Sequence, residues 1–125
     1  MSARRLWTVE EANEALPRVT EVVERARRAV QAVRERAGEV RETAGGNGHP
    51  KSPPAAAGFQ AAIEELAADG IVLRDPDRGL IDFPAAAPSG REYWLCWIVG
   101  ERAVEWWHWP EAGFAGRTPL AQPPE

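Results

Sequence analysis

The chain has a single cysteine among its 125 residues, and it lacks any apolar run near the ~18 residues that a membrane-spanning helix needs. One cysteine excludes an internal disulfide framework and fits a reducing compartment, so we expect a cytoplasmic protein. The first five residues are basic, but no apolar segment follows them, which argues against a signal peptide.

Familiar catalytic signatures are also missing. The sequence contains no Ser-His-Asp order, no Gly-rich phosphate loop and no Cys/His zinc spacing, so whether the protein is an enzyme stays open. Residues 1–58 carry ten Lys/Arg and eight Asp/Glu, whereas residues 59–125 carry five and eleven. Five of the six tryptophans lie in this acidic second half, which argues against a nucleic-acid partner.

The first half of the chain is typical of a helical hairpin. Thr8 and Glu11 form a capping box that predicts a helix from Val9, and Pro17 predicts a kink or break near Ala15. A second helix is expected at about 55–68, ended by a glycine. The first helix carries apolar residues at alternating spacings of three and four, a heptad seam: Leu16, Val19, Val23, Ala26, Val30, Val33, Ala37 and Val40.

The second half changes to the two-residue period of strands. We expect strands at 71–74, 80–83, 92–99 and 102–109, with a tight turn at Gly100-Glu101. The fold class is therefore α+β, with a long N-terminal helical hairpin packed on a four-stranded antiparallel meander. One domain covers 1–125: a helical part 8–69, a mobile loop 44–55, a sheet part 70–117 and a frayed tail 118–125.

A two-residue turn fixes the register of the last hairpin and places Tyr93 opposite His108. If Phe83 pairs with Glu92, Asp82 lies beside Tyr93 in the same row. Both faces of this sheet are then apolar, and one helical layer covers only one of them. Together with the overlong seam, this predicts a homodimer, although the sequence leaves open whether the seam is used within one chain or across a dimer.

Motifs along most of the chain resemble those of the domain of unknown function 2203 family of small bacterial proteins. The resemblance implies a bacterial cytoplasmic protein and supplies no activity. The matching stretches are Trp7 to Asn13 with Leu16-Pro17, Gly70-Ile71 with Asp75-Pro76, Gly79 to Pro84, Leu95 to Trp97 with Gly100-Glu101, Trp107-His108, and Gly113 to Arg117.

Two functional hypotheses follow. In the first, the protein is a non-enzymatic dimeric structural or interaction module. In the second, it binds a small ligand or a metal. This second hypothesis includes the case in which the protein is an enzyme. The ligand-binding candidates are Asp82, Tyr93, His108 and Arg117, and the candidate ligands for a divalent metal are Asp82 and His108. Cys96, expected to face Glu105, is interpreted as a plain buried cysteine because a carboxylate raises a thiol's pKa.

Overall fold

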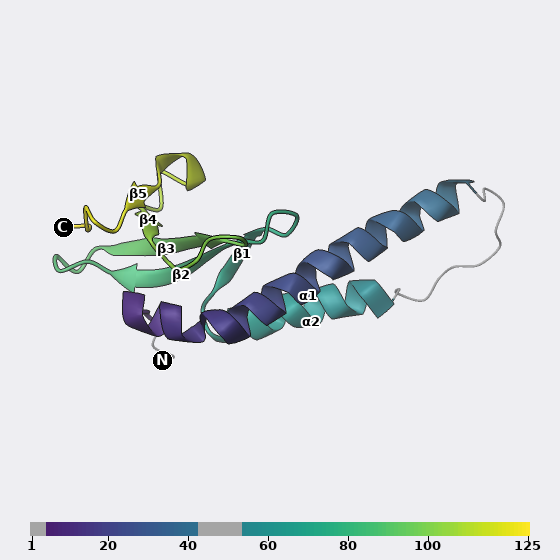
Figure 1. Ribbon diagram of the computed structural model, residues 1–125, viewed down its shortest axis with the longest axis horizontal. Helices are drawn as coiled ribbons and strands as arrows, with labels where there is room; N and C mark the ends of the chain where they lie inside the picture. The colour runs from purple at the N-terminus through teal and green to yellow at the C-terminus, as the bar shows by residue number, and fades with distance from the viewer. Residues whose placement is uncertain (1–4, 43–53) are drawn as a thin grey trace.

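The computed structural model describes residues 5–42 and 54–125. The α+β class is confirmed, with two helices followed by an antiparallel sheet of five strands (Figure 1). The elements are α1 (Val9–Glu42), α2 (Pro54–Ala68), β1 (Val72–Asp75), β2 (Leu80–Ala86), β3 (Glu92–Ile98), β4 (Trp106–His108), a 3-10 turn η1 (Phe114–Gly116) and β5 (Thr118–Pro119). Of the mobile loop expected at 44–55, residues 44–53 lie outside the described residues, and 54 and 55 belong to α2.

Helix α1 begins where the capping box predicts. The Glu11 N–H donates to Thr8 Oγ1 over 3.1 Å, and the Thr8 N–H donates to Glu11 Oε1 over 2.9 Å. Of the kink or break expected near Ala15, the break does not occur: α1 continues through Pro17. Leu16 and Val19 on either side of the proline are buried, so tertiary packing holds the turn that the proline weakens.

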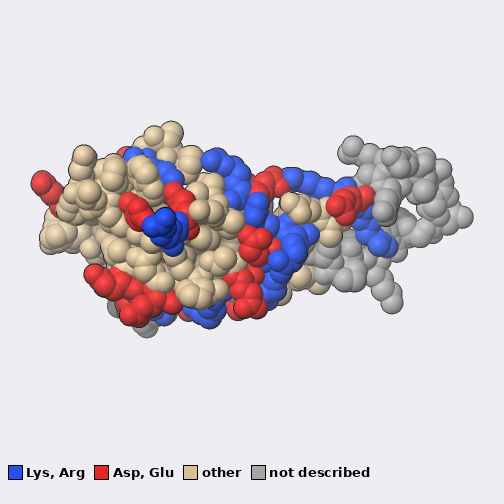
Figure 2. Space-filling view, viewed as in Figure 1, with Lys and Arg blue, Asp and Glu red and all other residues tan. Residues whose placement is uncertain are grey.

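The two helices form a pair that extends away from the sheet, with the first turns of α1 and the end of α2 packed against it (Figure 1). This corrects the expectation that the whole hairpin packs on the sheet. The reason is length: a 34-residue helix is about 51 Å long, whereas a seven-residue strand spans only about 23 Å. Figure 2 shows side chains of both charge signs crowded over the helices, while the sheet end of this face has more uncharged surface with acidic and basic side chains scattered over it.

The heptad seam is buried only along its first half. Its first four members are buried and the next two are half-buried: Leu16, Val19, Val23 and Ala26, then Val30 and Val33. The side chains of the last two members lie outside what the structure describes. Because α2 has only 15 residues, the seam outlasts its partner within the chain.

The strands run in the order β1-β2-β3-β4-β5, so the sheet is an antiparallel meander with one strand more than the four expected. The additional strand, β5, lies in the stretch expected to be a frayed tail. It pairs with β4, and the Trp107 indole N–H donates to the Gln122 carbonyl over 2.9 Å. Strand β4 is shorter than expected, because the chain rejoins the sheet only at Trp106.

The predicted register of the last hairpin is wrong by one residue. Trp94 pairs with His108 and Leu95 with Trp107, whereas a two-residue turn would have paired Tyr93 with His108. The chain does turn at Gly100, since the Glu101 N–H donates to the Ile98 carbonyl. It then leaves the sheet, and a one-residue slip moves every following side chain to the opposite face.

The connection between β3 and β4 is hydrogen-bonded to helix α1. The Val104 N–H donates to the Asn13 side-chain oxygen over 2.7 Å, and Val104 is buried. The guessed pairing of Phe83 with Glu92 is also wrong, because Phe83 pairs with Leu95 and Asp82 with Cys96. Asp82, Cys96 and His108 therefore share the outer face of the sheet, and Tyr93 lies on the core face.

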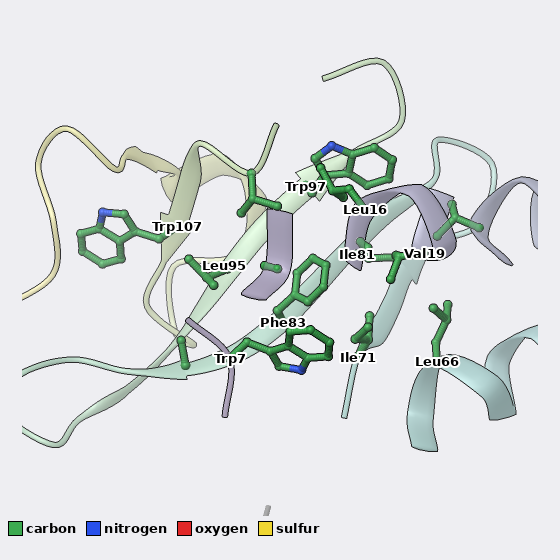
Figure 3. Close-up of a cluster of buried hydrophobic side chains, with 14 of the residues drawn as sticks. Trp7, Leu16, Val19, Leu66, Ile71, Ile81, Phe83, Leu95, Trp97 and Trp107 are labelled. Atoms are coloured by element: carbon green, nitrogen blue, oxygen red, sulfur yellow. The ribbon is translucent and has the colours of Figure 1, made fainter. Parts of the chain in front are cut away.

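The hydrophobic core lies between the first turns of α1, the end of α2 and the inner face of the sheet (Figure 3). Trp7 meets Phe83 edge to face, with ring centroids 5.2 Å apart. Its indole N–H donates to the Asp69 carbonyl at the end of α2, and its backbone N–H donates to the Pro84 carbonyl in β2. One residue thus ties the start of α1 to both other parts of the fold.

The outer face of the sheet is partly covered by the chain's own arginines. The Arg74 guanidinium lies 4.8 Å from the centre of the Trp94 ring, and that of Arg117 lies 4.9 Å from the Trp106 ring. Arg117 and Phe114 return to the sheet after the glycine turn, as expected. Because these contacts cover aromatic surface, the half-buried Val30 and Val33 of the α1 seam become the stronger reason to expect a second copy.

Candidate metal centre

Three chemically versatile side chains meet on the outer face, where β2, β3 and β4 lie side by side. Asp82 and Cys96 are direct cross-strand partners, and His108 projects from the same face of β4. All three are almost fully buried, with exposed fractions of 1%, 1% and 4%. A carboxylate, a thiol and an imidazole have thus been withdrawn from water together, and buried polar groups of this kind need partners.

The imidazole of His108 lies between two acceptors. Its Nδ1 is 2.8 Å from the Trp109 carbonyl oxygen, and its Nε2 is 3.0 Å from Asp82 Oδ2. Both nitrogens can donate to these acceptors only in the imidazolium form, so the two contacts favour the protonated ring. Burial lowers the pKa of His108, but the hydrogen bonds to Asp82 and to the Trp109 carbonyl outweigh burial and raise the pKa above its ordinary value of 6.5.

Arg74 supplies a second cation to Asp82. Its Nε donates to the same oxygen, Oδ2, over 2.9 Å. Leu73 pairs with Ile81 and Asp75 pairs with Leu80, so Arg74 is the extra residue of a β-bulge in β1. Bulges commonly re-aim a side chain next to a functional site, and this one places a guanidinium beside the buried carboxylate.

The thiol of Cys96 is a poor nucleophile in this environment. Burial raises its pKa to about 12, the negative charge of Asp82 adds to the increase, and Arg117 acts in the opposite direction. The sequence interpretation also had a carboxylate raise the pKa of the Cys96 thiol. The carboxylate is Asp82, however, because Cys96 does not face Glu105. A thiolate forms here only when something stronger than these neighbours stabilises it, and a bound metal ion does so.

One atom of the cluster is left without a partner. Asp82 Oδ2 accepts from both His108 and Arg74, whereas Oδ1 is buried and has no hydrogen-bond partner among the described residues. Such an atom is rare in a folded protein and calls for an explanation. One ligand atom each from Asp82, Cys96 and His108 lies within 4.8 Å of the others.

These atoms fit a zinc-type ion after a small contraction. Bond lengths of about 2.0–2.3 Å place the ligand atoms of a tetrahedral site roughly 3.3–3.8 Å apart, so a pair of ligand atoms at the 4.8 Å limit must close by about 1.0–1.5 Å. Oδ1 of Asp82 would bind the ion while Oδ2 keeps Arg74. His108 Nε2 would bind it while Nδ1–H keeps the Trp109 carbonyl, an arrangement typical of metal-binding histidines.

A cavity of about 250 Å³ adjoins the cluster. Three protein ligands leave a fourth tetrahedral position open, and open positions distinguish catalytic zinc sites from structural ones. The residues that line the cavity are Arg74, Leu80, Asp82, Cys96, His108, Pro110, Gly113 and Phe114.

Two of the four residues that the sequence nominates lie in this cluster. The nominated contact between Asp82 and His108 is present. Tyr93 lies on the other face, where it packs against Trp107, because the register is shifted. Arg117 pairs with Glu101 and donates to the Cys96 carbonyl, so it supports β3 from outside the ligand set.

Sequence reasoning missed Cys96 and Arg74. The signal for Cys96 was present: Asp82 and Cys96 are polar interruptions in two apolar strands, and a register that pairs them would have grouped them. The signal for Arg74 was weaker, because an arginine before a turn is common and the bulge that sets its position has no clear mark in the sequence.

Fold and site together define a small α+β protein with a buried carboxylate, thiol and imidazole on the outer face of a meander. Among the described residues, no helix is long and apolar enough to cross a membrane. Residues 5–120 match the model of an uncharacterized conserved protein family, DUF2203, and the chain belongs to that family. Comparison with curated proteins and with solved structures gave no match.

Proposed function

We propose that the protein binds one zinc-class divalent ion through Asp82, Cys96 and His108. The observation that carries the proposal is the unpartnered Asp82 Oδ1, which is buried next to a thiol and an imidazole. Calcium and magnesium prefer oxygen ligands alone, whereas a thiolate and an imidazole together favour zinc and related metals. A cytoplasmic location suits this proposal, because it keeps Cys96 reduced.

Metal binding is expected to release protons. At pH 7 the Cys96 thiol is protonated, because its pKa is raised to about 12, and a bound thiolate must lose that proton. Below the raised pKa of His108 the imidazolium loses a second proton. The logarithm of the zinc affinity should therefore rise by about one per pH unit above that pKa and by about two below it. Calorimetry in buffers of different ionisation enthalpy counts the protons, on protein purified without a histidine tag.

Two variants make this test specific. Cys96→Ala should abolish the thiol-dependent proton and most of the affinity. Glu105→Gln is the matched control, since Glu105 is an exposed carboxylate on the connection to β4, outside the cluster. Zinc binding that is absent from the wild type, or unchanged by Cys96→Ala, contradicts the proposal.

We further propose that the protein is a homodimer, as the dimeric module of the sequence analysis requires. The supporting observation is that α1 has 34 residues and α2 only 15, with Val30 and Val33 left half-buried. A second copy of α1 is the simplest cover for this part of the seam.

Light scattering at micromolar concentration should give about twice the chain mass of 13.7 kDa. Val33→Glu should return the protein to a monomer, because a charge in the seam opposes close helix packing, whereas Glu35→Gln on the exposed side should not. A monomer throughout a concentration and salt series would rule out the dimer.

A further inference from the structure

We infer that the open metal position and Arg74 together bind a small monocarboxylate. This inference rests on the proposed metal centre and names the class of molecule that the centre would take. The carboxylate would place one oxygen on the ion and face the guanidinium with the other.

The first argument is the state of Arg74. Two contacts hold its guanidinium: the Nε bond to Asp82 Oδ2 and the position of Cζ over the Trp94 ring, 4.8 Å from the ring centroid. Among the described residues, its terminal nitrogens have no hydrogen-bond partner, although the side chain lines the cavity. A guanidinium held in this way with free donors can bind the carboxylate oxygen that the ion leaves free, through a charge-assisted hydrogen bond.

The second argument is charge. A divalent ion with one carboxylate, one thiolate and a neutral imidazole is a neutral unit, so Arg74 leaves one positive charge at the cavity. Apart from Asp82, no acidic residue of the described chain lines that cavity. The other nearby guanidinium, that of Arg117, is already paired with Glu101. One anionic group restores neutrality, whereas a doubly charged phosphate would leave a negative charge without a partner.

The third argument is size and lining. A volume of about 250 Å³ is below the ~300–1,000 Å³ of sites for drug-sized ligands, so the occupant has only a few heavy atoms. Leu80, Pro110 and Phe114 make the remaining walls apolar. A carboxylate with a short apolar chain matches this lining better than phosphate or bicarbonate does.

The test uses protein saturated with Co²⁺, whose visible spectrum reports thiolate binding and changes at the open position. Propionate should shift the Co²⁺ bands, whereas propionamide, which has the same shape without the charge, should not do so at the same concentration. Arg74→Gln should raise the propionate dissociation constant at least tenfold, and Arg74→Lys should recover part of the loss because it keeps the charge. Arg91→Gln is the matched control, since Arg91 lies over the Trp109 ring, pairs with Glu111 and does not line the cavity.

Three results overturn the inference while leaving the metal centre intact: equal binding of propionamide, tighter binding of phosphate, or wild-type propionate affinity in Arg74→Gln. A different failure identifies the proposed function as the error. If Co²⁺ gives no thiolate charge-transfer band in the wild type, there is no such metal centre, and the carboxylate site is lost with it.

Discussion

Replacing His108 with alanine is expected to lower zinc affinity by more than a hundredfold and to reduce the free energy of unfolding of the metal-free protein by about 2–4 kcal/mol. The loss of affinity follows because changes to outer-shell partners alone cost about 10–100-fold, and His108 would be a direct ligand. The loss of stability follows because Asp82, which is 1% exposed in the intact protein, loses His108 and keeps Arg74 as its charged partner. Denaturant midpoints with and without zinc measure both effects.

The pH dependence of the metal-free protein provides an internal check. The pKa of His108 is raised in the folded state, so its stabilising contribution is complete below the unfolded value near 6.5. It is lost as pH rises through the higher folded pKa. The difference in unfolding free energy between the wild type and His108→Ala should therefore shrink with rising pH in this range. A difference that grows would contradict the imidazolium–carboxylate pair.

Asp82→Asn is the companion variant, because it keeps the size of the side chain and removes the charge. If Asp82 and His108 act as a pair, the effects of the two substitutions on stability should not add in the double variant. Additive effects would mean that the two side chains stabilise the protein independently, which would contradict the Asp82–His108 pair.

Trp7→Ala is expected to have the largest effect on stability among single substitutions in the core, about 3–5 kcal/mol. Trp7 is 3% exposed and packs edge to face on Phe83. Its loss leaves a cavity where α1, the end of α2 and β2 meet, and also leaves the Asp69 carbonyl without its donor. Chemical denaturation followed by far-ultraviolet circular dichroism measures the change without relying on tryptophan fluorescence.

Trp7→Phe separates packing from hydrogen bonding. Phenylalanine fills most of the volume but cannot donate to Asp69, so we expect a loss of about 1–2 kcal/mol. Equal losses for alanine and phenylalanine would mean that the indole hydrogen bond dominates, contrary to the packing argument.

Local chemistry made the helices and most strand positions predictable from the sequence. The capping box at Thr8 and the glycine at position 70, which has a positive φ of 76°, each act within a few residues. The Asp82–His108 contact could be anticipated only in part, because two polar groups near an aromatic sheet tend to pair. That inference held even though the row of side chains used to reach it was wrong.

The register was not predictable, because its cause lies far along the chain. Gly100-Glu101 is acceptable turn chemistry, and the local sequence gives no reason to reject a two-residue hairpin. In the structure the Val104 N–H instead donates to the side chain of Asn13, 91 residues away, a contact that the local sequence does not reveal. Cys96 was set aside for the same reason, because it joins Asp82 and His108 only in the shifted register.

This long-range hydrogen bond also bears on the order in which the chain is made. A hairpin closed locally at Gly100 forms in about 1–10 μs and, in its two-residue register, would turn His108 away from Asp82. During synthesis, α1 is made long before Val104. The Asn13 side chain is therefore available to bind the Val104 N–H as soon as the last strands are made. In refolding from denaturant this order is absent, because all segments of the chain begin to fold at the same time. Newly synthesised chains should therefore reach the register that joins Asp82, Cys96 and His108 more directly than refolded ones.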